Sequence, residues 1–298
     1  MSMLHALFSW RTKLACGGFA LVALGLSGCA SGPALELPVQ RFDAAYRGAS
    51  AQFAAGNLPN AADGFAQAER LASLYDRRAL RVQALLSIGA VAATREDDAR
   101  ALQAYTQAAE EAQGVRDAHA LGVALAGKAD ALRRSGDGDA ALQTYARALE
   151  SAALREGSTE RQQALMGQAL VWHAQGQRTA AWDALAQLEG ETRSSASPVL
   201  AGVLANQAVL LRDQGQPVAA LAKAQEALAL DRGASNPMAI AADLELLGRL
   251  HMAVQQPDHA RSHWERALRI VQDTGQTKAA QRLLGLLGGL PAALSLRQ

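Results

Sequence analysis

A fixed spacing of small and large apolar residues recurs along most of the chain. In the stretch DGDAALQTYARAL, residues 137–149, the residues Ala141, Tyr145 and Ala148 are separated by four and three positions, with polar residues between them. This spacing places all three on one face of a helix. Steps of 40 residues, and one step of 39, give five more triads: Ala61/Phe65/Ala68, Ala101/Tyr105/Ala108, Ala181/Leu185/Leu188, Ala220/Ala224/Ala227 and Ala260/Trp264/Ala267. Six copies of one pattern predict a repeat protein.

Each triad is preceded by a small residue about a dozen positions earlier, which indicates a first helix before the triad helix. These residues are Ala49, Gly89, Ala129, Ala169, Ala208 and Gly248. Small residues let two antiparallel helices approach closely, and the large triad residue fills the gap to the next pair. Four units have glycine in the turn, at positions 56, 136, 176 and 215, where a positive φ commonly ends a helix. Units two and six have Glu96 and Gln255 there, so we expect their turns to differ.

This arrangement resembles the tetratricopeptide repeat, in which small residues mark the first helix and an Ala–aromatic–Ala trio marks the second. The resemblance covers about residues 42–272. The period is about 40 residues instead of about 34, similar to kinesin light chain-like repeats, and the family's helix-ending proline is missing. The resemblance implies an all-α, right-handed solenoid with six helix–turn–helix units in residues 41–276. Residues 277–298 are then a capping helix and a tail.

Composition agrees with closely packed helices, because half of the residues are hydrophobic and only 4% are aromatic. Removing residues 1–28 takes away Arg11 and Lys13 and no acid, which leaves a net charge of −1. A near-neutral chain without a basic stripe argues against a nucleic-acid partner and against purely electrostatic membrane binding.

The N-terminus has the features of an export signal. Residues 14–26 form an apolar run of thirteen, which is too short to span a bilayer but suits a signal peptide. The sequence Leu26-Ser27-Gly28-Cys29 follows directly and resembles the lipobox of bacterial lipoproteins. This resemblance implies that residues 1–28 are removed, that Cys29 is acylated with chains such as palmitate, and that residues 29–40 are a tether. An ordinary signal peptide that ends near a cysteine is the alternative.

Sorting signals point to the outer membrane. Ala30 and Ser31 follow the cysteine, whereas Asp at that place would favour the inner membrane by resemblance to lipoprotein sorting. We therefore expect a lipid-anchored protein that faces the periplasm of a Gram-negative bacterium. The body that follows Cys29 has no other cysteine for a disulfide, a metal site or nucleophilic catalysis.

Catalytic motifs are lacking in the sequence. There is no GxSxG, P-loop or Rossmann glycine pattern, so we expect neither an enzyme nor a cofactor. His259 and His263 lie four residues apart and could share a helix face, but no glutamate follows His259 and no third ligand is evident. The alternative function is an enzyme accessory, or a metal- or small-ligand-binding module that uses the groove or the His259/His263 face.

The first helices line the concave groove of tetratricopeptide arrays, where peptides usually bind. Carrying that register across predicts these groove residues: Tyr46, Phe53, Leu86, Asp130, Arg133, Arg134, Met166, Leu170, His173, Asn206, Val209, Arg212, Arg249 and Met252. An apolar lane edged by arginines favours an apolar extended or helical segment with some acidic character. The alternative for each residue is helix packing. The leading hypothesis is a scaffold that binds a protein partner in this groove.

Overall fold

The computed structural model describes residues 37–150, 157–195 and 197–290 of the chain. Residues 1–36, with the expected signal peptide and Cys29, and residues 291–298 of the tail lie outside this range. The described part contains thirteen helices and no strand. The bounds are α2 Leu37–Ala54, α3 Leu58–Leu74, α4 Arg78–Thr94, α5 Asp98–Gly114, α6 Ala118–Arg134, α7 Gly138–Glu150, α8 Thr159–Ala174, α9 Arg178–Ser194, α10 Leu200–Asp213, α11 Pro217–Gly233, α12 Pro237–Ala253, α13 Pro257–Asp273 and α14 Thr277–Gly288.

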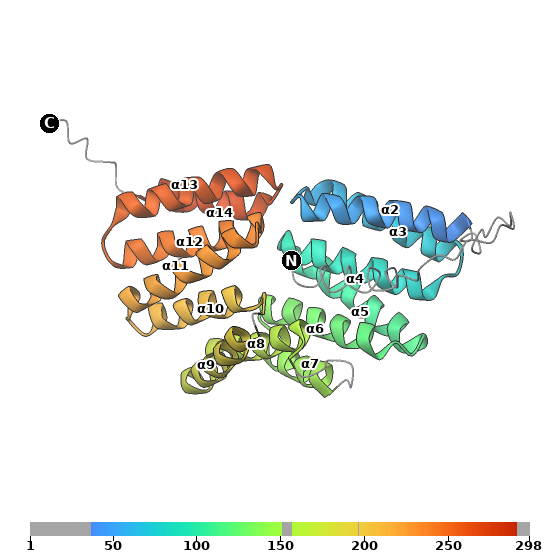
Figure 1. Cartoon of the computed structure of the whole chain (residues 1–298), viewed down its shortest axis with the longest axis horizontal. Coiled ribbons are helices and arrows are strands. Elements are labelled where there is room, and N and C mark those ends of the chain that lie inside the picture. The colour runs from blue at the N-terminus through green and yellow to red at the C-terminus, as the bar shows by residue number, and fades with distance from the viewer. Residues whose placement is uncertain (1–36, 151–156, 196, 291–298) are drawn as a thin grey trace, which may run out of the picture.

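Consecutive helices pack against each other in antiparallel pairs, which confirms the predicted all-α solenoid (Figure 1). The second helices of the six pairs begin at residues 58, 98, 138, 178, 217 and 257. The array starts slightly earlier than expected, because α2 begins at Leu37 inside the expected tether. Pro38 lies in its first turn, where a missing N–H costs little. Helix α14 covers the apolar end of the last pair with Leu283, which is fully buried.

The triad residues form the contacts between neighbouring helices. All of them are at most 3% exposed. The ring of Tyr105 lies between Gly89 of its own unit and Gly127 of the next, where an added Cβ would come within 2.7 and 2.5 Å of the ring. Trp264 lies against Gly248 in the same way, and its indole N–H donates to the carbonyl of Glu245 at 3.1 Å. The aromatic and the glycine are therefore complementary parts of one packing unit.

The turns inside all six pairs have the same backbone conformation. Gly56, Gly136, Gly176 and Gly215 have φ values between +75° and +92°. Glu96 and Gln255 adopt φ values of +57° and +60° at the equivalent positions. The expectation that the turns of units two and six differ is therefore wrong. Packing of the two helices imposes the left-handed residue, although a side chain there costs about 1–2 kcal/mol.

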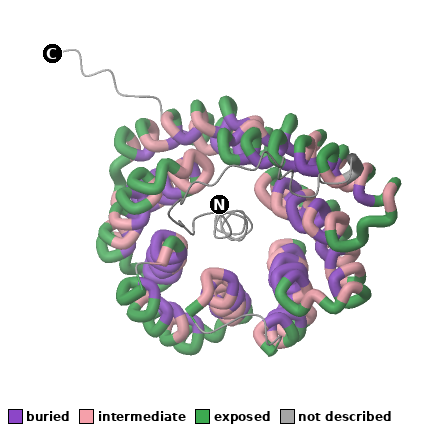
Figure 2. Tube along the Cα trace, turned by 45° about the vertical axis from the view of Figure 1, so that its right-hand side comes forward, coloured by how far each residue is buried: buried purple, intermediate pink, exposed green. Residues whose placement is uncertain are grey.

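The solenoid curves so far that its first and last pairs touch, and the helices form a ring (Figure 2). Gly56, in the turn after α2, lies against Thr274, in the turn after α13. A Cβ added to Gly56 would be 2.6 Å from Thr274 Cγ2. The contact is reciprocal, because a Cβ on Gly275 would be 3.1 Å from Cδ of Pro59. Two turns that are more than 200 residues apart in sequence thus interlock through their glycines.

Polar contacts join the same two ends of the array. The Arg282 Nη1 atom of α14 donates to both carboxylate oxygens of Glu96 at 2.9 Å. The Lys278 ammonium donates to the Glu96 carbonyl at 2.5 Å. Arg282 also binds Glu245 of α12, whose other partner is Arg249. A chain of four alternating charges therefore runs from unit six through the capping helix α14 to unit two.

Within the described ranges, no helix combines the length and the apolar character that a membrane crossing requires.

Candidate functional site

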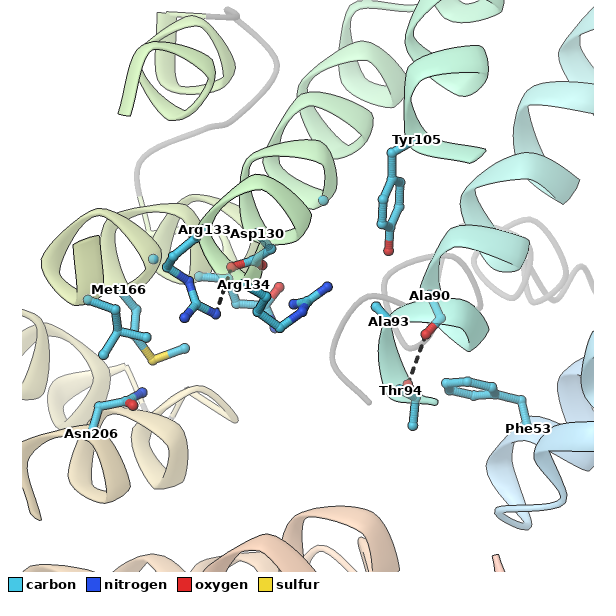
Figure 3. A pocket seen from close by; sticks show the side chains of 14 residues that line it. Phe53, Ala90, Ala93, Thr94, Tyr105, Asp130, Arg133, Arg134, Met166 and Asn206 are labelled. Atoms are coloured by element: carbon cyan, nitrogen blue, oxygen red, sulfur yellow. Dashed lines mark hydrogen bonds and ion pairs between the residues drawn. The ribbon is translucent and has the colours of Figure 1, made fainter. Parts of the chain in front are cut away.

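A cavity of about 440 Å³ faces the middle of the ring (Figure 3). Its walls come from the first helices of five units, α2, α4, α6, α8 and α10, and from Tyr105 of α5. Seven of the residues that line it belong to the predicted groove: Phe53, Asp130, Arg133, Arg134, Met166, Leu170 and Asn206. The structure brings these residues together because every unit turns the same helix face toward the ring centre.

Three of the predicted groove residues lie in the core. Phe53 borders the cavity but is only 3% exposed, because it packs with the aromatic residues of unit one. Tyr46 is 8% exposed; its ring stacks on Phe42 at 5.6 Å, and its hydroxyl shares a hydrogen bond with Ser87 at 2.8 Å. Leu86 is 5% exposed and packs with the apolar side chains of units two and three. Tyr46 shares one helix face with Phe42, Ala49 and Phe53, and this face packs against α3 and α4. In α4, Ala90 and Ala93, one and two turns after Leu86, line the cavity instead.

The remaining predicted residues lie outside the cavity lining. His173 shares a hydrogen bond with Asp213 at 3.0 Å, and Arg212 donates to the other oxygen of Asp213 at 2.8 Å. Burial opposes the charge of this carboxylate, but the two hydrogen bonds hold the pKa of Asp213 below its usual value. Arg249 is paired with Glu245 at 2.9 Å. Val209 packs against the C-terminal core, and Met252 is exposed.

Charged side chains from one end of α6 occupy the centre of the cavity wall. Asp130 accepts a hydrogen bond from the Tyr145 hydroxyl at 2.5 Å and a longer one from Arg133 at 3.5 Å. Burial, followed by the Asp130 charge, raises the pKa of Tyr145, so this phenol stays a donor. Arg134 donates from Nε to Asp98 at 2.5 Å. Both guanidinium groups are thus held from one side, and Figure 3 shows them between the apolar residues of α8 and those of α2 and α4.

Gln163 and Tyr105 also line the cavity, although the groove prediction missed them. Gln163 precedes Met166 by three residues and Leu170 by seven, so extending the helical register back by one turn identifies it. The triad pattern assigns Tyr105 to packing, which is correct for its ring. Its hydroxyl end points toward the cavity in Figure 3, and no local sequence pattern indicates this second role.

In unit six, the ring of His251 stacks on the rings of two other histidines. The ring of His251 lies 5.1 Å from the rings of His259 and His263, and its Nδ1 shares a hydrogen bond with Gln256 at 2.8 Å. Burial, followed by the neighbouring histidines and arginines, lowers the pKa of His263 to about 4. No group of three or more His, Cys, Asp or Glu side chains in the described part of the chain is arranged to hold a metal ion. The stack therefore gives no support to the metal-binding alternative.

Comparison with known proteins places the fold in a known class. A tetratricopeptide repeat model matches residues 124–160. No curated protein matches the chain. The crystal structure of apo RapI is similar with a TM-score of 0.63 and 11% identity, over 82% of this chain and 87% of that one. A Rap protein complexed with competence and sporulation factor has a TM-score of 0.62 and 11% identity, over 84% and 75%. The Cut9 structure from the APC/C hetero-tetramer Cut9–Hcn1 has a TM-score of 0.55 and 13% identity, over 83% and 43%.

These similarities concern the fold, because all of the identities are low. Together with the repeat match, they support a tetratricopeptide-repeat protein, and the architecture is a TPR-like helical-repeat solenoid.

Proposed function

We propose that this protein is a lipid-anchored scaffold that binds a segment of a partner protein in the central cavity. The observation that carries the proposal is the cavity itself, with the partly buried Met166 and Leu170 beside the charged end of α6. Apolar side chains on an inner wall gain free energy when a partner covers them. The Rap protein with competence and sporulation factor and the Cut9–Hcn1 assembly are complexes with a comparable fold, which supports a binding role.

The test introduces charge into the apolar part of the cavity. Met166→Glu and Leu170→Glu change two partly buried residues that line it. The matched control is Leu74→Glu, since Leu74 is 72% exposed at the end of α3 and does not line the cavity. After crosslinking and purification from detergent-solubilised membranes, the double variant should lose partner proteins that the wild type and the control retain. All three proteins should show the same helical circular dichroism. Equal recovery of every partner by the double variant would disprove the cavity assignment.

Attachment to the periplasmic face of the outer membrane is the second part of the proposal. It is supported by the apolar run 14–26, by Leu26-Ser27-Gly28-Cys29 and by the residues after Cys29. More than one acyl chain on Cys29 would give durable anchoring, because each buried methylene contributes about 0.8 kcal/mol. Cys29→Ser should remain unprocessed or be released into the soluble fraction, as shown by cell fractionation and the mass of the N-terminus. A processed Cys29→Ser protein that still sediments with membranes would contradict lipidation.

A further inference from the structure

Polar atoms without a hydrogen-bond partner gather in the central cavity. Arg133 Nε, Arg134 Nη2 and Gln163 Oε1 are buried, and none of them has a partner in the described part of the chain. All three residues line the same cavity. A buried donor or acceptor that is left unpaired destabilises the folded protein. Three such atoms around one open volume indicate a site whose polar partners come from another molecule.

The missing partner of the two arginines is an acceptor with negative charge. Each guanidinium offers five N–H groups. Arg134 uses Nε for Asp98, and Arg133 makes one long contact to Asp130, whose carboxylate also accepts from Tyr145. The nearby acids are thus already engaged, while donors of both arginines remain unsatisfied. A planar carboxylate matches the guanidinium fork and forms hydrogen bonds that are stronger than neutral ones.

The surroundings of the arginines distinguish a side-chain carboxylate from a chain end. In Figure 3, Met166 lies on one side of the arginine pair, and Phe53, Ala90 and Ala93 lie on the other. Apolar surface therefore continues past the charged centre in both directions, and a bound segment with an acidic residue in its middle covers both sides. The unpaired carbonyl oxygen of Gln163 accepts an N–H, which the main chain of an extended segment supplies.

We infer that the cavity recognises one aspartate or glutamate inside an apolar, extended segment of the partner protein. Arg133 and Arg134 bind its carboxylate, and Gln163 accepts a main-chain N–H. The flanking apolar side chains contact Met166 and Leu170 on one side and Ala90 and Ala93 on the other. This inference rests on the proposed scaffold function and adds the chemistry that selects the partner.

Pools of synthetic peptides that differ only in the presence and position of a carboxylate test the inference, so the partner protein itself is not needed. Each peptide has about nine residues, which extend to about 30 Å. The flanking positions carry a mixture of Ala, Leu, Met and Ser. The first pool has a central Glu and blocked ends, the second has a central Gln and blocked ends, and the third has a central Gln and a free C-terminal carboxylate. Binding to the mature chain is measured by fluorescence anisotropy at about 50 mM and about 300 mM salt, which changes the screening length about twofold.

The Glu pool should bind the wild type at least about tenfold more tightly than either Gln pool, because hydrogen bonds to charged groups are the strong ones. The preference should be weaker at high salt. It should disappear in Arg133→Gln and Arg134→Gln and persist in Arg147→Gln, an exposed arginine of the same unit that lies outside the cavity lining. Comparison of the pools on the wild type needs no variant, so a folding defect cannot produce the result.

Each other outcome overturns a defined part of the reasoning. Equal binding of the first two pools would overturn the carboxylate site and leave the scaffold function in place. Preference for the third pool would replace the internal acid by a chain end. Failure of every pool to bind would overturn the inference and the proposed cavity function together.

Discussion

The closure of the ring can be tested through the ion pair between Glu96 and Arg282. These residues are 186 positions apart, in the turn after α4 and in α14. An open solenoid would separate them, whereas the closed ring joins them through two hydrogen bonds of 2.9 Å. We therefore propose a double-mutant cycle with Glu96→Gln, Arg282→Gln and the double variant. The energetic coupling between the two positions measures whether they touch in solution.

The expected size of the coupling follows from exposure and geometry. The side chains of Arg282 and Glu96 are 37% and 39% exposed, and exposed pairs contribute about 0.2–1 kcal/mol. Arg282 is also held by the more buried Glu245, so less side-chain entropy is lost when it binds Glu96. This preorganisation places the coupling in the upper half of the range, at about 0.5–1 kcal/mol. The loss of the Glu245 contact occurs in both Arg282→Gln proteins and cancels in the cycle.

The assay is thermal and urea unfolding of the four proteins, followed by circular dichroism. The control cycle combines Glu96→Gln with Arg249→Gln, because Arg249 shares Glu245 with Arg282 but is not paired with Glu96. Its coupling should be close to zero. High salt should reduce the Glu96–Arg282 coupling through screening. A coupling that is indistinguishable from the control at low salt would show that the two ends of the solenoid do not meet.

Four further predictions concern packing and titration. Gly56→Cys with Thr274→Cys, made in mature protein with Cys29→Ser, should oxidise to a disulfide seen as a mobility shift without reductant. The Cβ built at Gly56 is 3.3 Å from Thr274 Cβ, near the usual disulfide range, and a chain that keeps both thiols would argue for an open ring. Gly127→Val should lower the melting temperature, at a cost of about 1–3 kcal/mol, because its Cβ would lie 2.5 Å from the Tyr105 ring; unchanged stability would contradict this packing. Burial, and after it the charge of Asp231, raises the pKa of Asp243. The protonated Asp243 therefore contributes to the stability of the folded protein at low pH, and this contribution is lost as the pH rises from about 4 through the folded-state pKa. Asp243→Asn should thus melt higher than the wild type at pH 8 but not at pH 4, and equal melting at pH 8 would refute this. The pKa of His263 is lowered to about 4, so the contribution of neutral His263 to folding stability is lost as the pH falls from about 6.5 toward 4. His263→Phe should therefore reduce the change in melting temperature over this pH range.

The sequence predicted the packing of each unit well, since this packing is local and repeated. The triad of Ala141, Tyr145 and Ala148 reads directly as a buried face, and the three residues are fully buried. The capping helix expected within residues 277–298 corresponds to α14, which spans Thr277–Gly288. Helical spacing and glycine turns determine these features within a few residues of each position.

Ring closure and the exact lining of the cavity were harder to predict from sequence. Whether Gly56 meets Thr274 depends on the sum of small rotations between successive pairs, and no residue pattern encodes that sum. The repeat register assigns Tyr46 to the groove, but this residue packs in the core, because it shares one apolar helix face with Phe42 and Phe53. The sequence prediction missed Gln163, because a polar residue one turn before Met166 resembles an ordinary solvent-exposed position.

The six repeats share their packing residues but differ in the residues that face the cavity, and these differences bear on the proposed function. At one inward-facing position of the first helix, successive units from one to four carry Phe53, Ala93, Arg133 and His173. The structure places the first three of these around one cavity, while the packing residues that surround them barely change in character. A substitution at a triad alters the packing of the ring, whereas a substitution at Ala93 or Arg133, which are only partly buried, alters the surface of the cavity. Unit three alone carries two adjacent arginines at its inward face, Arg133 and Arg134, and the proposed selectivity for a partner therefore rests mainly on that unit.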